Sequence, residues 1–193
     1  MNFIVGIIMA VRSLTFMASF VSVDSSAVSF IEPQIILSEQ EAKIKIGLKN
    51  ALTGELLKLA SSGTTIPLYI YVDLMKENAK EPAFRTIVEI ELNYDFAAKR
   101  YNVRRNLSQD TLYVSTLDSA VQAVSFLPAF PIFPTAILDR NEFYHLNIYS
   151  ILGKTTVEAL GNNNLDLMYY WDFKRPSIKT EKYKGESFII KKN

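Results

Sequence analysis

The chain of 193 residues contains no cysteine and a single histidine, His145. Without cysteine it can form no disulfide, no thiolate zinc site, no iron–sulfur cluster and no thiol nucleophile. One imidazole cannot supply the sites of the common zinc hydrolases, which need two. The sequence also lacks Gly-x-Gly-x-x-Gly and Walker A loops, so nucleotide cofactors have no support, and it lacks a Gly-x-Ser-x-Gly turn for a serine nucleophile. We therefore predict no cofactor.

Charge of one sign is also missing, because 21 Lys and Arg balance 20 Asp and Glu to a net charge of +1. This balance argues against a dedicated nucleic-acid binder. Hydrophobic residues make up 49% of the chain, which is too many for a disordered protein. Length and composition together predict one globular domain, with room for a leader or anchor.

The longest apolar stretch runs from Phe3 to Val23, and Arg12 is its only charge. As a membrane anchor, this stretch would place Arg12 near the bilayer centre at a cost of about 2.5–3.5 kcal/mol. Translation from Met9 would instead make Arg12 the positive start of a signal peptide, with small residues for cleavage at 25–27. A buried N-terminal helix of a cytosolic protein is a third interpretation. We expect residues 1–27 to be a helical signal peptide or membrane anchor, and the protein to be exported to the periplasm or cell envelope.

Beyond the leader, apolar residues recur mainly at every second position, as in half-buried strands. The clearest case is Phe84–Tyr94, which leads through a short polar break into Arg100–Arg105, as in an antiparallel hairpin. Further strands are expected at Ala42–Lys49, Ile66–Met75, Thr111–Ser115, Phe143–Leu152 and Leu165–Phe173. Even spacing and little alternation of strands with helices predict a mainly β fold, an antiparallel two-layer β-sandwich spanning residues 28–176.

Two short α-helices are expected between the strands. Thr53 can cap the first, which runs to about Ala60 and is followed by Gly63 as a left-handed stop. The second begins after Ser115, with Asp118 as the partner in a capping box, and the sequence places Pro128 beyond its end. Their apolar stripes are typical of core packing.

The C-terminus is the most basic part of the chain. From Lys174 onward, seven basic residues stand against Glu181 and Glu186. We expect residues 177–193 to form a basic C-terminal tail, either solvated or in contact with anionic lipid headgroups.

Glu89 and Glu91 lie two residues apart on one expected strand, so both side chains project from the same face, about 6.5–7 Å apart at the backbone. Paired carboxylates can perform acid/base chemistry or hold a hard cation. Arg85 shares their face, however, and alternating Arg and Glu is typical of an ordinary sheet surface. A carboxylate-based hydrolase or metal-dependent enzyme built on Glu89, Glu91 and Asp172 remains the alternative to a non-enzymatic protein.

The segment from Phe126 to Pro134 combines three prolines with several large apolar residues. It is either a rigid crossover that covers an open end of the sandwich or an exposed apolar rim that binds a partner or an acyl chain. In the second case the candidate interaction residues are Phe130, Ile132 and Phe133, together with Trp171 on the last expected strand.

Several short motifs occur in a characteristic order: Leu37-Ser38-Glu39-Gln40, Gly63-x-x-Ile66-Pro67-Leu68, Leu92-Asn93-Tyr94-Asp95 with Arg100-Tyr101-x-Val103, Ser115-x-Leu117-x-x-Ala120 and Tyr170-Trp171-Asp172-Phe173. In this order they resemble the bacterial exported family catalogued as domain of unknown function 4390, over about Ile31 to Tyr183. The chain departs from the family pattern in having fewer tryptophans before the hairpin and a longer basic tail. The resemblance implies a signal-bearing envelope protein with no assigned activity or catalytic residues.

The sequence thus predicts an exported, non-catalytic binding or accessory module for a protein or an apolar ligand in the cell envelope. A sensory or accessory domain of a membrane partner, with its tail on the lipid surface, is a further hypothesis. Nucleic acid is not an expected partner.

Overall fold

The computed structural model describes residues 13–14, 27–107, 111–157 and 163–188. Most of the expected leader helix lies outside these residues. The described parts of the leader are Ser13–Leu14, a short strand (β1) that pairs with β2 (Ser29–Leu37), and Ala27; the helix prediction for the rest lies outside the described residues. Within the described chain no helix is both long enough and apolar enough to cross a bilayer.

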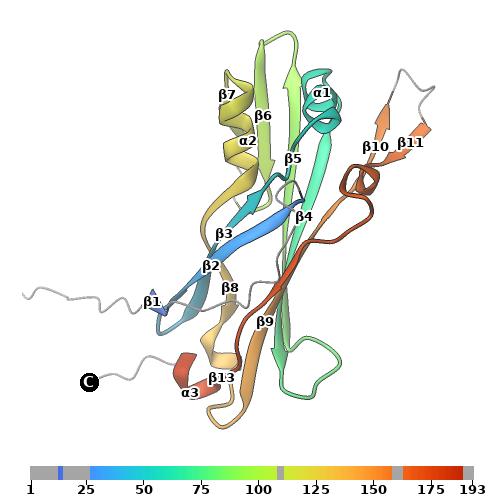
Figure 1. The fold of residues 1–193 in the computed structure, drawn as a ribbon. Coiled ribbons are helices and arrows are strands. Elements are labelled where there is room, and N and C mark those ends of the chain that lie inside the picture. Colours follow the sequence, from blue (N-terminus) through green and yellow to red (C-terminus); the bar gives the residue numbers. More distant parts are fainter. Residues whose placement is uncertain (1–12, 15–26, 108–110, 158–162, 189–193) are drawn as a thin grey trace, which may run out of the picture.

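Two antiparallel sheets stack face to face (Figure 1). The smaller has the order β1-β2-β3-β8, and the larger has the order β12-β9-β4-β5-β6-β7, with β13 also paired to β9. The smaller sheet contains β2 (Ser29–Leu37), β3 (Glu41–Lys49) and β8 (Phe126–Pro134). The larger contains β4 (Ile66–Lys76), β5 (Phe84–Asp95), β6 (Arg100–Arg105), β7 (Thr111–Val114), β9 (Phe143–Leu152), β12 (Ser177–Lys179) and β13 (Tyr183–Lys184). A separate hairpin joins β10 (Lys154–Val157) to β11 (Asn163–Asp166).

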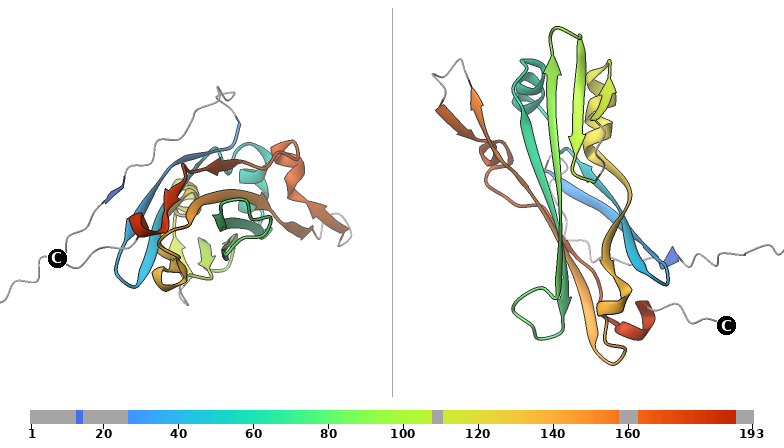
Figure 2. Two further views of the ribbon diagram at one scale, coloured as in Figure 1. Left: turned by 90° about the horizontal axis from the view of Figure 1, so that it is seen from below. Right: turned by 180° about the vertical axis from the view of Figure 1, so that it is seen from behind.

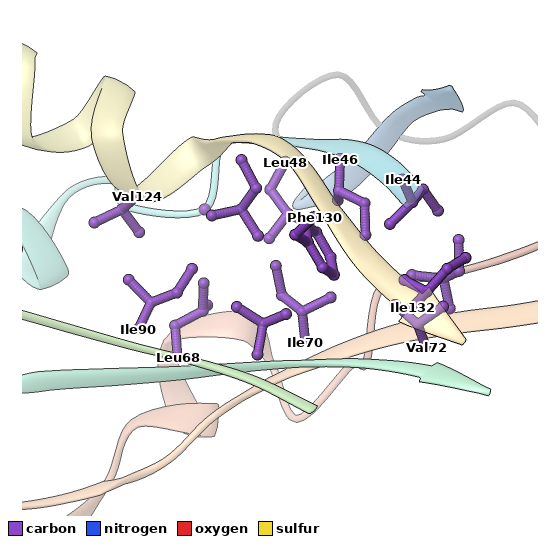
Figure 3. Close-up of a cluster of buried hydrophobic side chains, with 14 of the residues drawn as sticks. Ile44, Ile46, Leu48, Leu68, Ile70, Val72, Ile90, Val124, Phe130 and Ile132 are labelled. Atoms are coloured by element: carbon purple, nitrogen blue, oxygen red, sulfur yellow. The ribbon is translucent and has the colours of Figure 1, made fainter. Parts of the chain in front are cut away.

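The core lies between the sheets and follows from the two-residue period of the strands. Figure 3 shows apolar side chains of β3 and β8 pointing toward those of β4 and β5. The labelled residues that make this contact are Ile44, Ile46, Leu48, Phe130, Ile132, Leu68, Ile70, Val72 and Ile90, together with Val124. Each large aliphatic side chain taken out of water contributes about 1.5–3 kcal/mol. The predicted mainly β, antiparallel sandwich is confirmed.

The prediction of a strand at Leu165–Phe173 is wrong beyond Asp166. The chain leaves β11 at Asp166 and forms a 3₁₀ helix, η3 (Leu167–Trp171). The carboxylate of Asp166 caps this turn by accepting a hydrogen bond from the Met168 amide at 3.0 Å. Leu167 and Trp171 are both buried, but Tyr169 between them is 64% exposed, whereas the two-residue period of a strand would place all three on one face.

The two expected helices are present with different caps. The first, α1 (Glu55–Ser61), begins after Gly54 and has no side-chain cap, so the prediction of Thr53 was wrong. The second, α2 (Leu117–Ser125), is capped one residue later than expected, by Thr116, whose Oγ1 accepts from the Ser119 amide at 3.2 Å. Gly63 follows α1 with φ +83°, which confirms the left-handed stop.

The segment rich in Pro and Phe is neither a crossover nor an exposed rim. It forms β8, which pairs with β3 at the edge of the smaller sheet. Proline is tolerated there because an edge strand needs hydrogen-bond donors on one side only.

The C-terminal boundary at 176/177 is also wrong. Residues 177–179 and 183–184 form β12 and β13 on the larger sheet, and α3 (Gly185–Phe188) follows them. Phe188 is 2% exposed, so the sandwich continues to this residue. The rest of the expected tail, residues 189–193, lies outside the described residues.

Candidate binding surface

The four candidate interaction residues are all part of the interior. Phe130, Ile132 and Phe133 are 2–3% exposed, and Trp171 is 6% exposed. The Trp171 indole Nε1 donates to the backbone oxygen of Ala51 at 3.1 Å, which attaches η3 to the residues before α1. None of the four therefore offers an exposed surface to a partner.

One of the paired carboxylates, Glu91, belongs to a surface ion pair. Glu91 Oε2 accepts hydrogen bonds from Arg104 Nε at 3.0 Å and Nη2 at 2.6 Å, across the β5–β6 pairing. Glu89 is exposed, and Asp172 lies elsewhere, at the end of η3. Across the described ranges, no three His, Asp or Glu residues come close enough to hold a metal ion.

The outward side of the larger sheet carries a cluster that sequence reasoning missed. Tyr71 on β4 and Tyr149 on β9 face each other in register, with ring centroids 4.7 Å apart and planes within 3° of parallel. The Arg85 guanidinium, from β5 on the other side of β4, lies 5.9 Å from the centroid of the Tyr71 ring. Ile87, opposite Tyr71 on β5, is 39% exposed. We call Tyr71, Tyr149, Arg85 and Ile87 the tyrosine–arginine face.

Asp73 holds the guanidinium of Arg85 in place. Arg85 Nε donates to Oδ1 of Asp73 at 2.6 Å, and Nη2 donates to Oδ2 at 2.7 Å. Asp73 is 3% exposed, whereas the Arg85 side chain is 43% exposed. The bidentate bond raises the pKa of Arg85, so its positive charge is permanent.

Two tyrosines near this ion pair, Tyr149 and Tyr69, have a raised pKa. Burial raises the pKa of Tyr149, and the opposing effect of Arg85 is smaller. Burial also raises the pKa of the neighbouring Tyr69, and the charge of Glu89 adds to it. Their hydroxyl groups therefore remain hydrogen-bond donors.

A second exposed group lies where η3 ends. Tyr169 and Phe173 are each 64% exposed, and their rings meet edge to face with centroids 6.4 Å apart. The next two residues, Lys174 and Arg175, are also exposed. We call Tyr169, Phe173, Lys174 and Arg175 the aromatic turn.

Left-handed backbone at two consecutive residues shapes this turn, since Asp172 has φ +50° and Phe173 has φ +55°. The Phe173 amide donates to the Met168 oxygen at 2.9 Å, and the Asp172 amide donates to the Tyr169 oxygen at 3.1 Å. These two bonds form a Schellman motif, in which Asp172 takes the position that glycine normally occupies. A bulky residue with positive φ costs about 1–2 kcal/mol, so the fold sustains strain to hold Phe173 outward.

His145, the only histidine, is 9% exposed on the outward side of β9. Its Nδ1 is buried and has no hydrogen-bond partner in the described structure. Burial lowers the pKa of His145, and the charges of Lys179 and Lys182 lower it further against a weaker effect of Glu77. The imidazole is therefore neutral at pH 7.

The chain matches no family model, no curated protein and no solved structure in the comparisons. Its resemblance to domain of unknown function 4390 therefore stays a prediction.

Proposed function

We propose that this protein is a non-catalytic binding or accessory module of the cell envelope, which binds a protein partner through the tyrosine–arginine face. The observation that carries the proposal is the ordered stack of Tyr149, Tyr71 and Arg85 on the outward side of the larger sheet. Tyrosine and arginine are enriched among the residues that dominate binding energy at protein interfaces.

The side chains of the tyrosine–arginine face are already ordered before a partner binds. The bidentate bond to Asp73 fixes the guanidinium of Arg85, and the parallel contact fixes both tyrosine rings. A partner that binds here has little side-chain entropy left to remove, so more of the contact energy becomes affinity. Ile87 adds exposed apolar area beside the stack.

The enzyme alternative has weaker support. A carboxylate site would need Glu89 and Glu91 to act on one ligand, but Glu91 already binds Arg104. Catalytic carboxylates also need a concave, desolvated setting, and Glu89 is exposed on the sheet surface.

Export remains part of the proposal and is supported by the composition of residues 1–27. The mass of the protein isolated from the bacterium that makes it tests this part. Loss of a leader ending near residue 27 is the expected result for a signal peptide, and an intact leader is expected for an anchor.

Site-specific photocrosslinking in that bacterium tests the binding proposal. A photoreactive amino acid at Ile87 should give an adduct of one discrete mass. The same amino acid at Phe126, which is 51% exposed on the smaller sheet, should not give it. Tyr149→Ser should weaken the adduct at position 87, with folding checked by denaturation. Equal adducts at both positions, or none at position 87, would refute the proposal.

A further inference from the structure

The aromatic turn has a chemistry different from that of the tyrosine–arginine face. It presents two aromatic rings, each 64% exposed, followed directly by two cations. None of the ion pairs among the described residues involves Lys174 or Arg175. Both cations are therefore available to an outside anion.

The other side of the same turn is fixed to the core. Leu167 and Trp171 are buried, and the indole of Trp171 donates to the backbone of Ala51. Because of this anchor and the Schellman motif, the exposure of Tyr169 and Phe173 is built into the backbone. In the left view of Figure 2, the orange-red coil of η3 and the β10–β11 hairpin project from one side of the sandwich.

We propose that the aromatic turn rests on an anionic lipid surface, with Tyr169 and Phe173 at the level of the headgroups and Lys174 and Arg175 against their phosphates. Aromatic side chains with a basic neighbour are typical of membrane–water interfaces. Asp172 offsets one of the two positive charges, so insertion of the rings supplies a large part of the attraction. This inference goes beyond the proposed function, because it concerns a partner of another class, although Arg175 lies near enough to Tyr149 for its charge to act on that side chain.

Charge and projection favour a membrane here over a protein partner. The turn projects with the β10–β11 hairpin from one side of the sandwich, and a flat bilayer can be reached by a projection without a complementary groove. Its exposed cations match the negative surface of a leaflet that contains phosphatidylglycerol. A label on the turn that stays in water when vesicles are added would favour a protein partner instead.

The absence of cysteine allows a local test on the full chain. Tyr169→Cys, labelled with an environment-sensitive fluorophore, reports on the turn itself. Phe96→Cys, labelled in the same way, is the matched control, because Phe96 is 63% exposed in the loop between β5 and β6. A local reporter is needed because residues 1–27 could bring the chain to vesicles by themselves.

Vesicles of phosphatidylethanolamine and phosphatidylglycerol should shift the emission of the label at 169 to shorter wavelength and leave the label at 96 unchanged. Lys174→Gln with Arg175→Gln should raise the lipid concentration at half-effect about tenfold or more. Phe173→Ser should also raise it, and high salt should act mainly through the two cations. Sedimentation with vesicles that leaves the label at 169 in water, or an equal shift at 96, would overturn the proposal.

Discussion

At the scale of single residues, Gly185 is the described glycine at which an added side chain would meet the closest contact. A β-carbon there would overlap the backbone carbonyl oxygen of Asp139, and the Gly185 amide donates to the Glu142 oxygen at 2.7 Å. Because backbone cannot yield as a flexible side chain does, we expect Gly185→Ala to lower the free energy of unfolding by about 3 kcal/mol. Urea denaturation measures this change.

Ser187→Ala is the matched control, because Ser187 is exposed on the same short helix. It should change the free energy of unfolding by less than about 0.5 kcal/mol. Equal stability of the two variants would show that α3 does not pack against Asp139 as the structure has it.

His145 makes stability depend on pH in a definite direction. Because burial and the nearby lysines lower its pKa in the folded state, the unfolded chain takes up a proton first, near pH 6.5. Protonation therefore favours unfolding, and the contribution of His145 to stability is complete above pH 6.5 and declines as the pH falls below it.

The His145→Gln variant isolates this effect, since glutamine does not titrate. Unfolding free energies of both proteins, measured from pH 7.5 to 5, should show the wild type losing more stability than the variant. Parallel curves would mean that His145 has the same pKa in the folded and unfolded states.

At the scale of elements, the cap of α2 gives a direct test of a boundary. Thr116 Oγ1 accepts from the Ser119 amide and donates to the Ser119 hydroxyl at 2.8 Å. Thr116→Ala should lower the free energy of unfolding by about 1 kcal/mol, whereas Ser115→Ala should have little effect. Thermal or urea unfolding distinguishes the two, and a larger loss from Ser115→Ala would place the cap one residue earlier.

Strands with strict alternation could be predicted from the sequence because burial on one face is a local pattern. Phe84–Tyr94 and Phe143–Leu152 both appear as expected. The strand β8 was not predicted because it contains three prolines. Proline is disfavoured in the centre of a sheet but allowed in an edge strand, and the sequence does not show which position a strand takes. At Leu165–Phe173 the alternation misled, because the burial of Trp171 depends on Ala51, which lies far away in the sequence.

At the scale of the molecule, the tyrosine–arginine face could not be predicted, because it too depends on contacts between residues that lie far apart in the sequence. Tyr71 and Tyr149 come together only through the register between β4 and β9, and that register depends on long-range packing. In this region the sequence predicted only Trp171 as an interaction residue, and Trp171 is buried. The 3₁₀ turn and its left-handed end determine which rings point outward. Neither feature can be predicted from the periodicity of the sequence.

Phe188 contacts both sheets near the C-terminus. A substitution at Phe188 therefore tests whether the C-terminal residues help to stabilise the fold. Its ring packs edge to face on Phe133 of the smaller sheet and on Tyr183 of the larger, with centroid distances of 6.1 Å in both cases. A basic tail that acted through charge alone would depend on contacts such as Lys182 with Glu77, at 2.6 Å on the surface.

Phe188→Ala should therefore lower the free energy of unfolding by about 3–5 kcal/mol, because it removes a buried ring that contacts both layers. Lys182→Ala should lower it by about 1 kcal/mol or less, since exposed ion pairs contribute little. Urea denaturation of both variants measures the difference, and a single transition for Phe188→Ala would show that the two sheets unfold together. If Lys182→Ala were the more damaging change, electrostatics rather than packing would hold the C-terminus to the sandwich.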